Sequence, residues 1–253
     1  MLKTIQYAAA AALIAASQLA AADVAGVVLT DIKVAASGGQ WWDVIFKDVS
    51  WLEPTAGAVA GLDDPATSDS KSGWHGNAMT ASVSDYHGAA TAGTTAATSG
   101  DFDGMTAFAN AAATNRESVW AFSKVYDGKV LVGSGTTITV SAKLADIYAS
   151  GTGTSQANAS IELCGADFSN AADALVNCVP MSFAEAFVDQ SLPGYTGPSV
   201  LSASWTNDSS DGAWTWMRIG LSASVQALPE PTSAMLCLAS LGAAAAVRRR
   251  RKG

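Results

Sequence analysis

Residues 136–144 read Thr-Thr-Ile-Thr-Val-Ser-Ala-Lys-Leu, and their alternation decides the expected fold. Apolar side chains recur there at every second position, namely Ile138, Val140, Ala142 and Leu144. Because side chains of an extended chain point alternately to opposite sides, these four share one face. The β-branched residues among them and between them also favour a strand. We therefore predict a half-buried β-strand that turns this face to a core.

Other segments carry the same signals, and we expect each of them to be a strand. They are residues 24–34, 41–49, 157–163, 200–205 and 213–225. Residues 118–132 also alternate, and the Asp127-Gly128 pair within them predicts a hairpin turn. A polar turn at 207–212 is expected to join the last two strands.

Three segments lack these signals. Residues 53–73 are polar and contain Pro, Asp and Ser, which predicts a long loop. Residues 88–100 are almost wholly Ala, Thr, Ser and Gly, which predicts a low-complexity connection that need not pack. Residues 170–176 are predicted to form a short helical turn. Short strands, Gly-rich turns and little helix together predict an all-β body, built as an antiparallel β-sandwich.

Two segments resemble strands of the galactose-binding-like jelly rolls that occur in many carbohydrate-binding modules. Residues 135–144 are similar to the central strand of those domains. Residues 212–219, Gly-Ala-Trp-Thr-Trp-Met-Arg-Ile, are similar to their penultimate strand, in which a Trp precedes alternating apolar residues. The resemblance implies a jelly-roll-like fold. It implies no binding residue, because the sugar-contacting positions of that family lie on variable loops.

The C-terminal residues 228–253 form a tripartite tail. Leu-Pro-Glu-Pro-Thr is followed by an uncharged, Ala- and Leu-rich run and then by five cations, Arg248, Arg249, Arg250, Arg251 and Lys252. A helix over 232–247 falls somewhat short of a bilayer core of about 30 Å, but arginines can reach the headgroups and recover the length. We predict a transmembrane helix whose basic end stays in the cytoplasm. A buried core helix that ends in surface arginines is the alternative.

The Pro229-Glu230-Pro231 motif, the apolar segment and the Arg cluster closely resemble the PEP-CTERM sorting signal. The resemblance implies that exosortase, an integral-membrane cysteine protease, recognises this motif during export. It would then remove the helix and release or transfer the mature protein at the cell envelope. Pro229 and Pro231 also exclude helix, which leaves an extended peptide that a protease can reach. A sortase signal, Leu-Pro-x-Thr-Gly, fits less well, because Pro231 stands fourth and no Gly follows Thr232.

The N-terminal residues 1–22 have the features of a secretory signal peptide. Lys3 supplies the positive start, an apolar stretch follows, and residues 20–22 supply small side chains before a cut ahead of Asp23. The two targeting segments leave a mature extracytoplasmic domain, 23–227, whose length suits one β-sandwich. We expect secretion machinery to export the chain as a precursor anchored in the inner membrane. The product would lie in the cell envelope, at the cell surface or outside the cell.

The charge of the mature domain agrees with export. The whole chain has 14 basic and 22 acidic residues. Residues 23–231, which exclude Lys3 and the five C-terminal cations and include Glu230, keep 8 basic residues against 22 acidic ones, a net charge of −14. Nucleic acid and anionic membrane surfaces are therefore poor partners, and the acidity favours solubility outside the cell.

Cys164 and Cys178 are the two cysteines outside the tail. In an oxidising compartment we predict a disulfide between them, which closes a loop of about fourteen residues and contributes about 3 kcal/mol. A metal site is the alternative interpretation. Two cysteines without a nearby His do not supply its ligands.

The sequence contains no Gly-x-Ser-x-Gly elbow, His-Glu-x-x-His motif or P-loop. Its two histidines, His75 and His87, would share a metal in one interpretation and are ordinary surface residues in the other. Residues 101–104, Asp-Phe-Asp-Gly, point to calcium, but an EF-hand needs Gly and Glu where Thr106 and Ala112 stand. We expect no cofactor. A structural calcium ion held by Asp carboxylates and backbone carbonyls stays open, and the ligands of any metal are unknown.

Eight tryptophans all lie in the body of the chain. Most fall in predicted strands, where core packing is the default. Trp51 and Trp74 flank the predicted long loop and are the expected exposed pair. Since a Trp ring stacks well against a sugar ring, these two are the candidate ligand contacts.

Two functions remain open. We expect a non-enzymatic surface or matrix protein associated with extracellular polysaccharide, since exosortase systems, by the PEP-CTERM resemblance, accompany exopolysaccharide production. The alternative is a secreted hydrolase that acts on polysaccharide through a carboxylate pair the sequence does not single out. Polar residues clustered at one end of the sandwich would favour the enzyme, and an aromatic strip without acids would favour binding.

Overall fold

The computed structural model describes residues 23–38, 44–47, 53–59, 67–71, 77–84, 88–98, 102–113, 118–151, 153–165, 179–192 and 194–226. These residues form thirteen β-strands and no helix. The strands are β1 (Asp23–Ser37), β2 (Val44–Lys47), β3 (Glu53–Val59), β4 (Thr67–Ser70), β5 (Met79–Ser84), β6 (Gly88–Thr94), β7 (Met105–Ala113), β8 (Ser118–Val132), β9 (Thr137–Ser150), β10 (Thr154–Gly165), β11 (Val179–Asp189), β12 (Val200–Thr206) and β13 (Ala213–Gln226). This part of the chain therefore has no helix long and apolar enough to cross a membrane. The signal peptide and the helix expected at 232–247 lie outside it and stay predictions.

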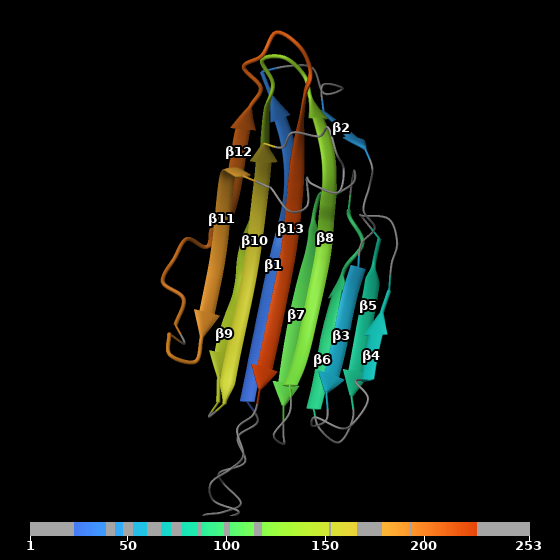
Figure 1. Ribbon diagram of the computed structural model, residues 1–253, viewed down its shortest axis with the longest axis vertical. Helices are drawn as coiled ribbons and strands as arrows, with labels where there is room; N and C mark the ends of the chain where they lie inside the picture. The colour runs from blue at the N-terminus through green and yellow to red at the C-terminus, as the bar shows by residue number, and fades with distance from the viewer. Residues whose placement is uncertain are drawn as a thin grey trace, which may run out of the picture.

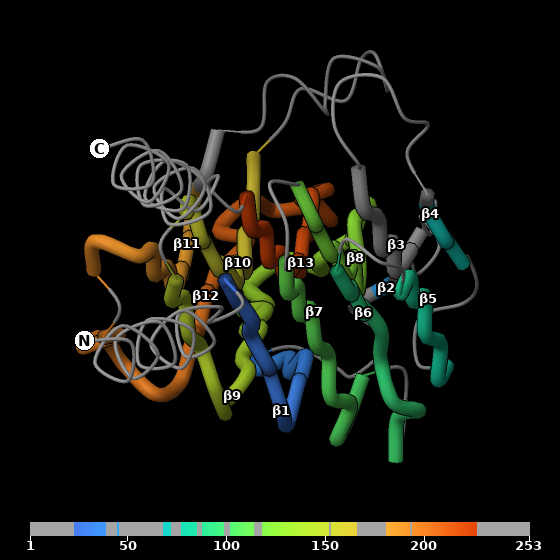
Figure 2. The backbone as a smooth tube through the Cα atoms, turned by 90° about the horizontal axis from the view of Figure 1, so that it is seen from below, coloured from blue at the N-terminus to red at the C-terminus, as the bar shows by residue number. Residues whose placement is uncertain are grey.

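The strands pair into two antiparallel sheets, which Figure 2 shows as two rows when the molecule is viewed from below. The six-stranded sheet has the order β12-β9-β1-β7-β6-β5. The seven-stranded sheet has the order β11-β10-β13-β8-β3-β4, and β2 pairs with the end of β8 that β3 leaves free. The predicted all-β class is confirmed, and the two layers are consistent with the predicted sandwich.

Alternation along each strand puts the core between the two sheets. In β9, Ile138, Val140 and Ala142 are buried as predicted, and Leu144 is partly buried against the same core. The central strands β1, β8, β9 and β13 each have 14 or 15 residues. At about 3.3 Å per residue the sandwich is therefore about 50 Å long. Its outline in Figure 1 is correspondingly elongated.

Large side chains and alanines occupy different parts of the core. Fully buried large residues include Leu29, Ile32, Met105, Tyr126 and Ile138. The inner faces of β6 and β7 carry instead a group of alanines, Ala90, Ala92, Ala107, Ala109, Ala111 and Ala113. Because an alanine buries little apolar area, this part of the core contributes less hydrophobic stabilisation per residue.

Three strands occupy segments that we predicted to be loops, and these predictions were wrong. β3 and β4 lie within residues 53–73, and β6 lies within residues 88–100. β3 pairs with β8 on one side and with β4 on the other, and β6 lies between β5 and β7. Hydrogen bonds to neighbours on both sides thus hold β3 and β6, and pairing with β3 holds β4, although the composition of these segments carries a weak β signal.

Residues 118–132 form one uninterrupted strand, β8, and the predicted hairpin was wrong. Asp127 and Gly128 pair in register with Arg218 and Met217 of β13, in the middle of a long antiparallel ladder. A neighbouring strand therefore overrides the local turn preference of this dipeptide. We also did not predict β5, β7 and β11. Residues 170–176, the expected helical turn, lie outside the described residues.

Side chains of the seven-stranded sheet cap both edge strands of the six-stranded sheet. On one side, the Ser82 backbone N–H of β5 donates to Asp69 Oδ2 of β4 at 3.0 Å. On the other side, the Ser204 backbone N–H of β12 donates to Ser182 Oγ of β11 at 2.9 Å. All four strands lie at the ends of their sheets. Since free N–H groups at a sheet edge invite pairing with another chain, these bonds protect both edges.

The first and last described residues lie at the same end of the sandwich (Figure 1). The buried Asp23 accepts a hydrogen bond at Oδ2 from the Gly153 backbone N–H at 3.0 Å. Gly153 precedes Thr154, which pairs with Gln226 at the end of β13. A side chain on Gly151, whose φ is +136°, would overlap the Asp23 carboxylate. The β9–β10 turn thus ties the start of β1 to the end of β13.

Candidate functional site

A β-bulge in β8 shapes the outer face of the seven-stranded sheet. The register with β13 shifts between Ile219 and Gly220, which leaves Val125 as the extra residue of β8. Val125 and Tyr126 are consecutive and both fully buried, so the alternation of β8 changes phase here. As a result Asp127 reaches the outer face of the sheet, where it can meet the outward side chains of β13.

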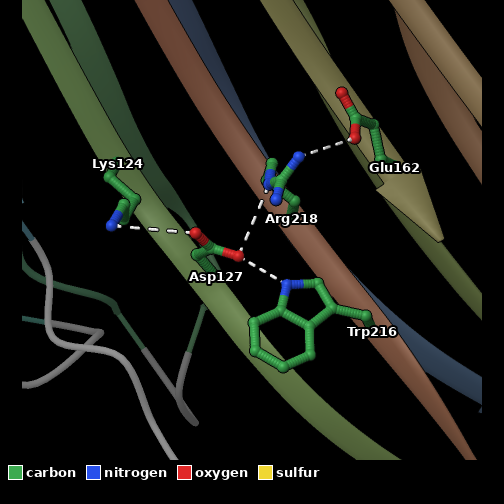
Figure 3. A network of polar contacts seen from close by, with 5 residues as sticks. All are labelled: Lys124, Asp127, Glu162, Trp216 and Arg218. Atoms are coloured by element: carbon green, nitrogen blue, oxygen red, sulfur yellow. Dashed lines mark hydrogen bonds and ion pairs between the residues drawn. The ribbon is translucent and has the colours of Figure 1, made fainter. Parts of the chain in front are cut away.

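Five side chains from three strands form a network on this face (Figure 3). Asp127 Oδ1 accepts hydrogen bonds from Trp216 Nε1 at 2.5 Å and from Arg218 Nε at 3.4 Å. Lys124 Nζ lies 3.7 Å from Asp127 Oδ2. Arg218 Nη1 in turn donates to Glu162 Oε2 of β10 at 3.3 Å. Asp127 and Trp216 are buried, whereas Lys124, Glu162 and Arg218 are partly exposed.

The network connects β8, β13 and β10 through one guanidinium group. Asp127 and Glu162 both accept hydrogen bonds from Arg218. The Arg218 guanidinium therefore holds both acidic side chains in position across the three strands.

A strip of small polar residues lies next to the network. It consists of Gly220 and Ser222 of β13, paired in register with Ser160 and Asn158 of β10. A Cβ added at Gly220 would meet no atom within 4 Å, so the sheet is open to solvent at this point. We refer to these four residues as the polar strip.

Exposed phenylalanines border the polar strip on both sides. Phe122 of β8 pairs with Ser222 and is 48% exposed. On β11, Phe187 pairs with Asn158 and is 44% exposed, and Phe183 is 48% exposed. Since neighbouring strands lie about 4.8 Å apart, roughly 14 Å separate β8 from β11. The polar strip and its three phenylalanines form the candidate binding face.

Most of the residues that the sequence singled out lie outside the described residues. They are Trp51, Trp74, His75, His87, Cys178, Pro229, Glu230, Pro231, Arg248, Arg249, Arg250, Arg251 and Lys252. Their roles stay predictions. Cys164 is described and is fully buried near the end of β10, where it pairs in register with Trp216. Within the described ranges, no three His, Cys, Asp or Glu side chains lie close enough to hold a metal ion.

Sequence reasoning missed the three phenylalanines of the binding face. Phe183 and Phe187 are four residues apart, so alternation alone would have placed them on one face once β11 was recognised as a strand. Phe122 lay in what we took for the first arm of a hairpin. The default prediction of core packing holds for Trp205, whereas Trp216 is buried on the outer face of the sheet, beside Asp127.

The C-terminal tail matches a known family model. Residues 227–252 match the PEP-CTERM protein-sorting motif, which confirms the resemblance that the tail carries. The motif implies an exported protein with a membrane-anchored precursor that exosortase sorts to the cell surface. No curated protein and no solved structure matches the chain. The jelly-roll resemblance of the body therefore stays a prediction.

Proposed function

We propose that this chain is a surface or matrix protein whose β-sandwich binds extracellular polysaccharide without cleaving it. The PEP-CTERM motif at residues 227–252 supports the first half of this proposal, because it implies export and sorting by exosortase. The mature net charge of −14 supports an extracellular role away from nucleic acid. The binding role depends on the outer face of the seven-stranded sheet.

The observation that carries the proposal is the polar strip with its exposed phenylalanines. A polysaccharide presents apolar C–H faces and hydroxyl edges, and such a ligand needs aromatic surface beside hydrogen-bonding groups. Phe122 on one side and Phe187 on the other supply the aromatic surface. Ser222 and Asn158 between them supply the polar groups, and Gly220 leaves the floor open.

The ion-pair network supports a binding role that does not involve cleavage. It holds Arg218 and Lys124 beside the polar strip, where the Glu185 carboxylate of β11 accepts a hydrogen bond from the Asn158 amide. Hydrogen bonds from a buried indole and a guanidinium keep Asp127 in one position, so the face is built before any ligand arrives. A preformed face binds with a smaller loss of side-chain entropy.

The experiment measures binding of the mature, processed protein to exopolysaccharide isolated from the same cells. We expect Phe122→Ala and Phe187→Ala each to weaken binding about tenfold, which corresponds to about 1.4 kcal/mol. Leu192→Ala is the matched control, because Leu192 is an exposed apolar residue in the turn that follows β11. Equal binding of all variants would contradict the face, and new reducing ends in the polysaccharide would contradict a role without cleavage.

A further inference from the structure

A hollow lies on the opposite side of the molecule from the candidate binding face, on the outer face of the six-stranded sheet. Its volume is about 180 Å³, and it extends over β1, β7 and β6. The residues that line it include Val24, Ala89, Thr91, Asn110, Ala112 and Tyr148. Nothing in the proposed polysaccharide face uses these residues, since the two sites are on different sheets.

A single glycine allows this hollow to have an aromatic wall. Tyr148 of β9 and Asn110 of β7 both pair in register with Gly26 of β1, which lies between them. A Cβ added at Gly26 would overlap the Tyr148 phenol and the Asn110 side chain. The Tyr148 ring therefore lies across β1 in the space that a side chain would take. Its hydroxyl donates to Asn110 Oδ1 at 3.3 Å.

The lining groups define the chemistry of a ligand. No charged residue lines the hollow, so a neutral ligand loses the least hydration on entering it. Alanine methyl groups and the Tyr148 ring present apolar surface. The Asn110 amide and the Thr91 hydroxyl supply a donor and an acceptor beside it. Burial, and to a lesser degree the Asp146 carboxylate, raises the pKa of Tyr148, which keeps the phenol neutral.

We propose that this hollow binds one ring of a neutral sugar, a hexopyranose at the end or on a branch of a glycan. Such a ring has an apolar C–H face that packs on the aromatic and alanine surface, and hydroxyls that bond to Asn110, Thr91 and Tyr148. The volume is below the range of about 300–1,000 Å³ that is typical of pockets for larger ligands, so a single ring fits better than an extended chain. The site is separate from the proposed polysaccharide face.

The test is a titration of the ¹⁵N-labelled mature protein with methyl glycosides of glucose, galactose and mannose, and with glucuronate as the charged probe. A single ring with few contacts binds in the millimolar range, so the titration runs to about 50 mM. We expect at least one methyl glycoside to shift the amide resonances of Thr91, Asn110 and Tyr148. Glucuronate should bind at least tenfold more weakly. Absence of any shift there with all three glycosides would overturn the proposal.

Variants distinguish the contribution of the Tyr148 ring to binding from that of its hydroxyl. Tyr148→Ala should weaken glycoside binding at least tenfold, and Tyr148→Phe, which keeps the ring, should weaken it a few-fold. Gly26→Ala displaces the phenol and should abolish binding, whereas Gly194→Ala adds the same methyl group in open space and should change nothing. Thermal unfolding of each variant shows whether it is folded. Unchanged glycoside binding by folded Tyr148→Ala would overturn the site.

The two proposals fail independently of each other. Phe187→Ala, on the seven-stranded sheet, should leave the glycoside titration unchanged while it weakens polysaccharide binding. Loss of glycoside binding in Phe187→Ala would place the sugar on the wrong sheet and overturn the inference. If the protein binds a glycoside in this hollow but does not bind polysaccharide, the proposed function is wrong and the inferred sugar site still holds.

Discussion

Asp127 is the residue on which the outer face of the seven-stranded sheet depends. The bulge at Val125 brings it to that face, and Trp216 and Arg218 both donate to it. Its removal would leave the buried indole N–H of Trp216 without that acceptor. A buried polar group that loses its partner costs more than the hydrogen bond itself contributed.

We therefore expect Asp127→Ala to lower the free energy of unfolding by about 2–4 kcal/mol. Lys124→Ala is the matched control, because Lys124 is partly exposed and lies 3.7 Å from the same carboxylate. An ion pair at that exposure contributes less than about 1 kcal/mol. Urea unfolding of both variants measures the difference. Equal losses would mean that the network acts only through its surface ion pair.

Cys164 leads to a second prediction at the residue scale. It is fully buried at the end of β10, and the predicted partner, Cys178, follows fourteen positions later in the sequence. We expect the mature protein to contain this disulfide, with about 3 kcal/mol of stability lost on reduction. Mass spectrometry of peptides prepared without reductant decides the matter. Free thiols at both positions would refute it.

At the scale of the strand, Asp69 makes edge protection depend on pH. The hydrogen bond from the Ser82 backbone N–H, and next the one from the Lys71 ammonium group, lower the pKa of the Asp69 carboxyl. A carboxyl group whose pKa is lower in the folded state than in the unfolded state stabilises the fold at pH values above its ordinary, unfolded-state pKa. That stabilisation is lost as the pH falls through the lowered value. Acid should therefore weaken the cap on β5.

We expect Asp69→Ala to expose the edge of β5 at neutral pH and to increase self-association. Asp69→Asn keeps an oxygen that can accept from Ser82, so it should remain closer to the wild type and should no longer respond to acid. Light scattering from about pH 3 to about pH 7 measures both effects. If Asp69→Ala stays monomeric throughout, the side-chain cap does not protect this edge.

The strands differ in how well their sequences predict them. β9 and β13 were predicted because β-branched and aromatic residues alternate with small polar ones. β7 was not predicted, although its inner positions from Met105 to Ala113 alternate strictly in burial. Four of those five positions are alanine, whose small side chain gives little hydrophobic contrast and little strand preference. Pairing with β1 and β6 decides its structure, and that information is remote in the sequence.

At the scale of the whole molecule, the tail could be predicted from the sequence and the binding faces could not. The sorting motif is a linear signal in which a protease reads adjacent residues, Pro229 to Pro231. The polar strip and its phenylalanines join β8, β10, β11 and β13, which only the sheet order brings together. The bulge that turns Asp127 outward is defined by the pairing of β8 with β13, so no local pattern in β8 predicts it.

The sorting motif gives a prediction for the full-length precursor. Replacement of Pro229, Glu230 and Pro231 by Ala should remove the recognition element and let helix extend toward Leu228, because Ala is the best helix former. We expect most of the protein to remain uncut in the membrane fraction. Replacement of the four arginines, Arg248 to Arg251, by Ser should act differently, by weakening retention and orientation. The mass of the product and its partition between membrane and medium measure both. Normal release of the Ala variant would show that the motif is incidental.

The β9–β10 turn ties Asp23 to the end of β13, and this end of the sandwich leads into the predicted membrane helix. Only residues 227–231 separate Gln226 from the helix expected at 232, a reach of at most about 18 Å. An anchored precursor about 50 Å long would therefore keep this end near the membrane, with the 207–212 turn at the opposite end of the sandwich. Many such molecules, anchored side by side, would form a layer on the membrane. Their flat flanks, with Phe187 on one side and Tyr148 on the other, would then face neighbouring molecules and the glycan between them.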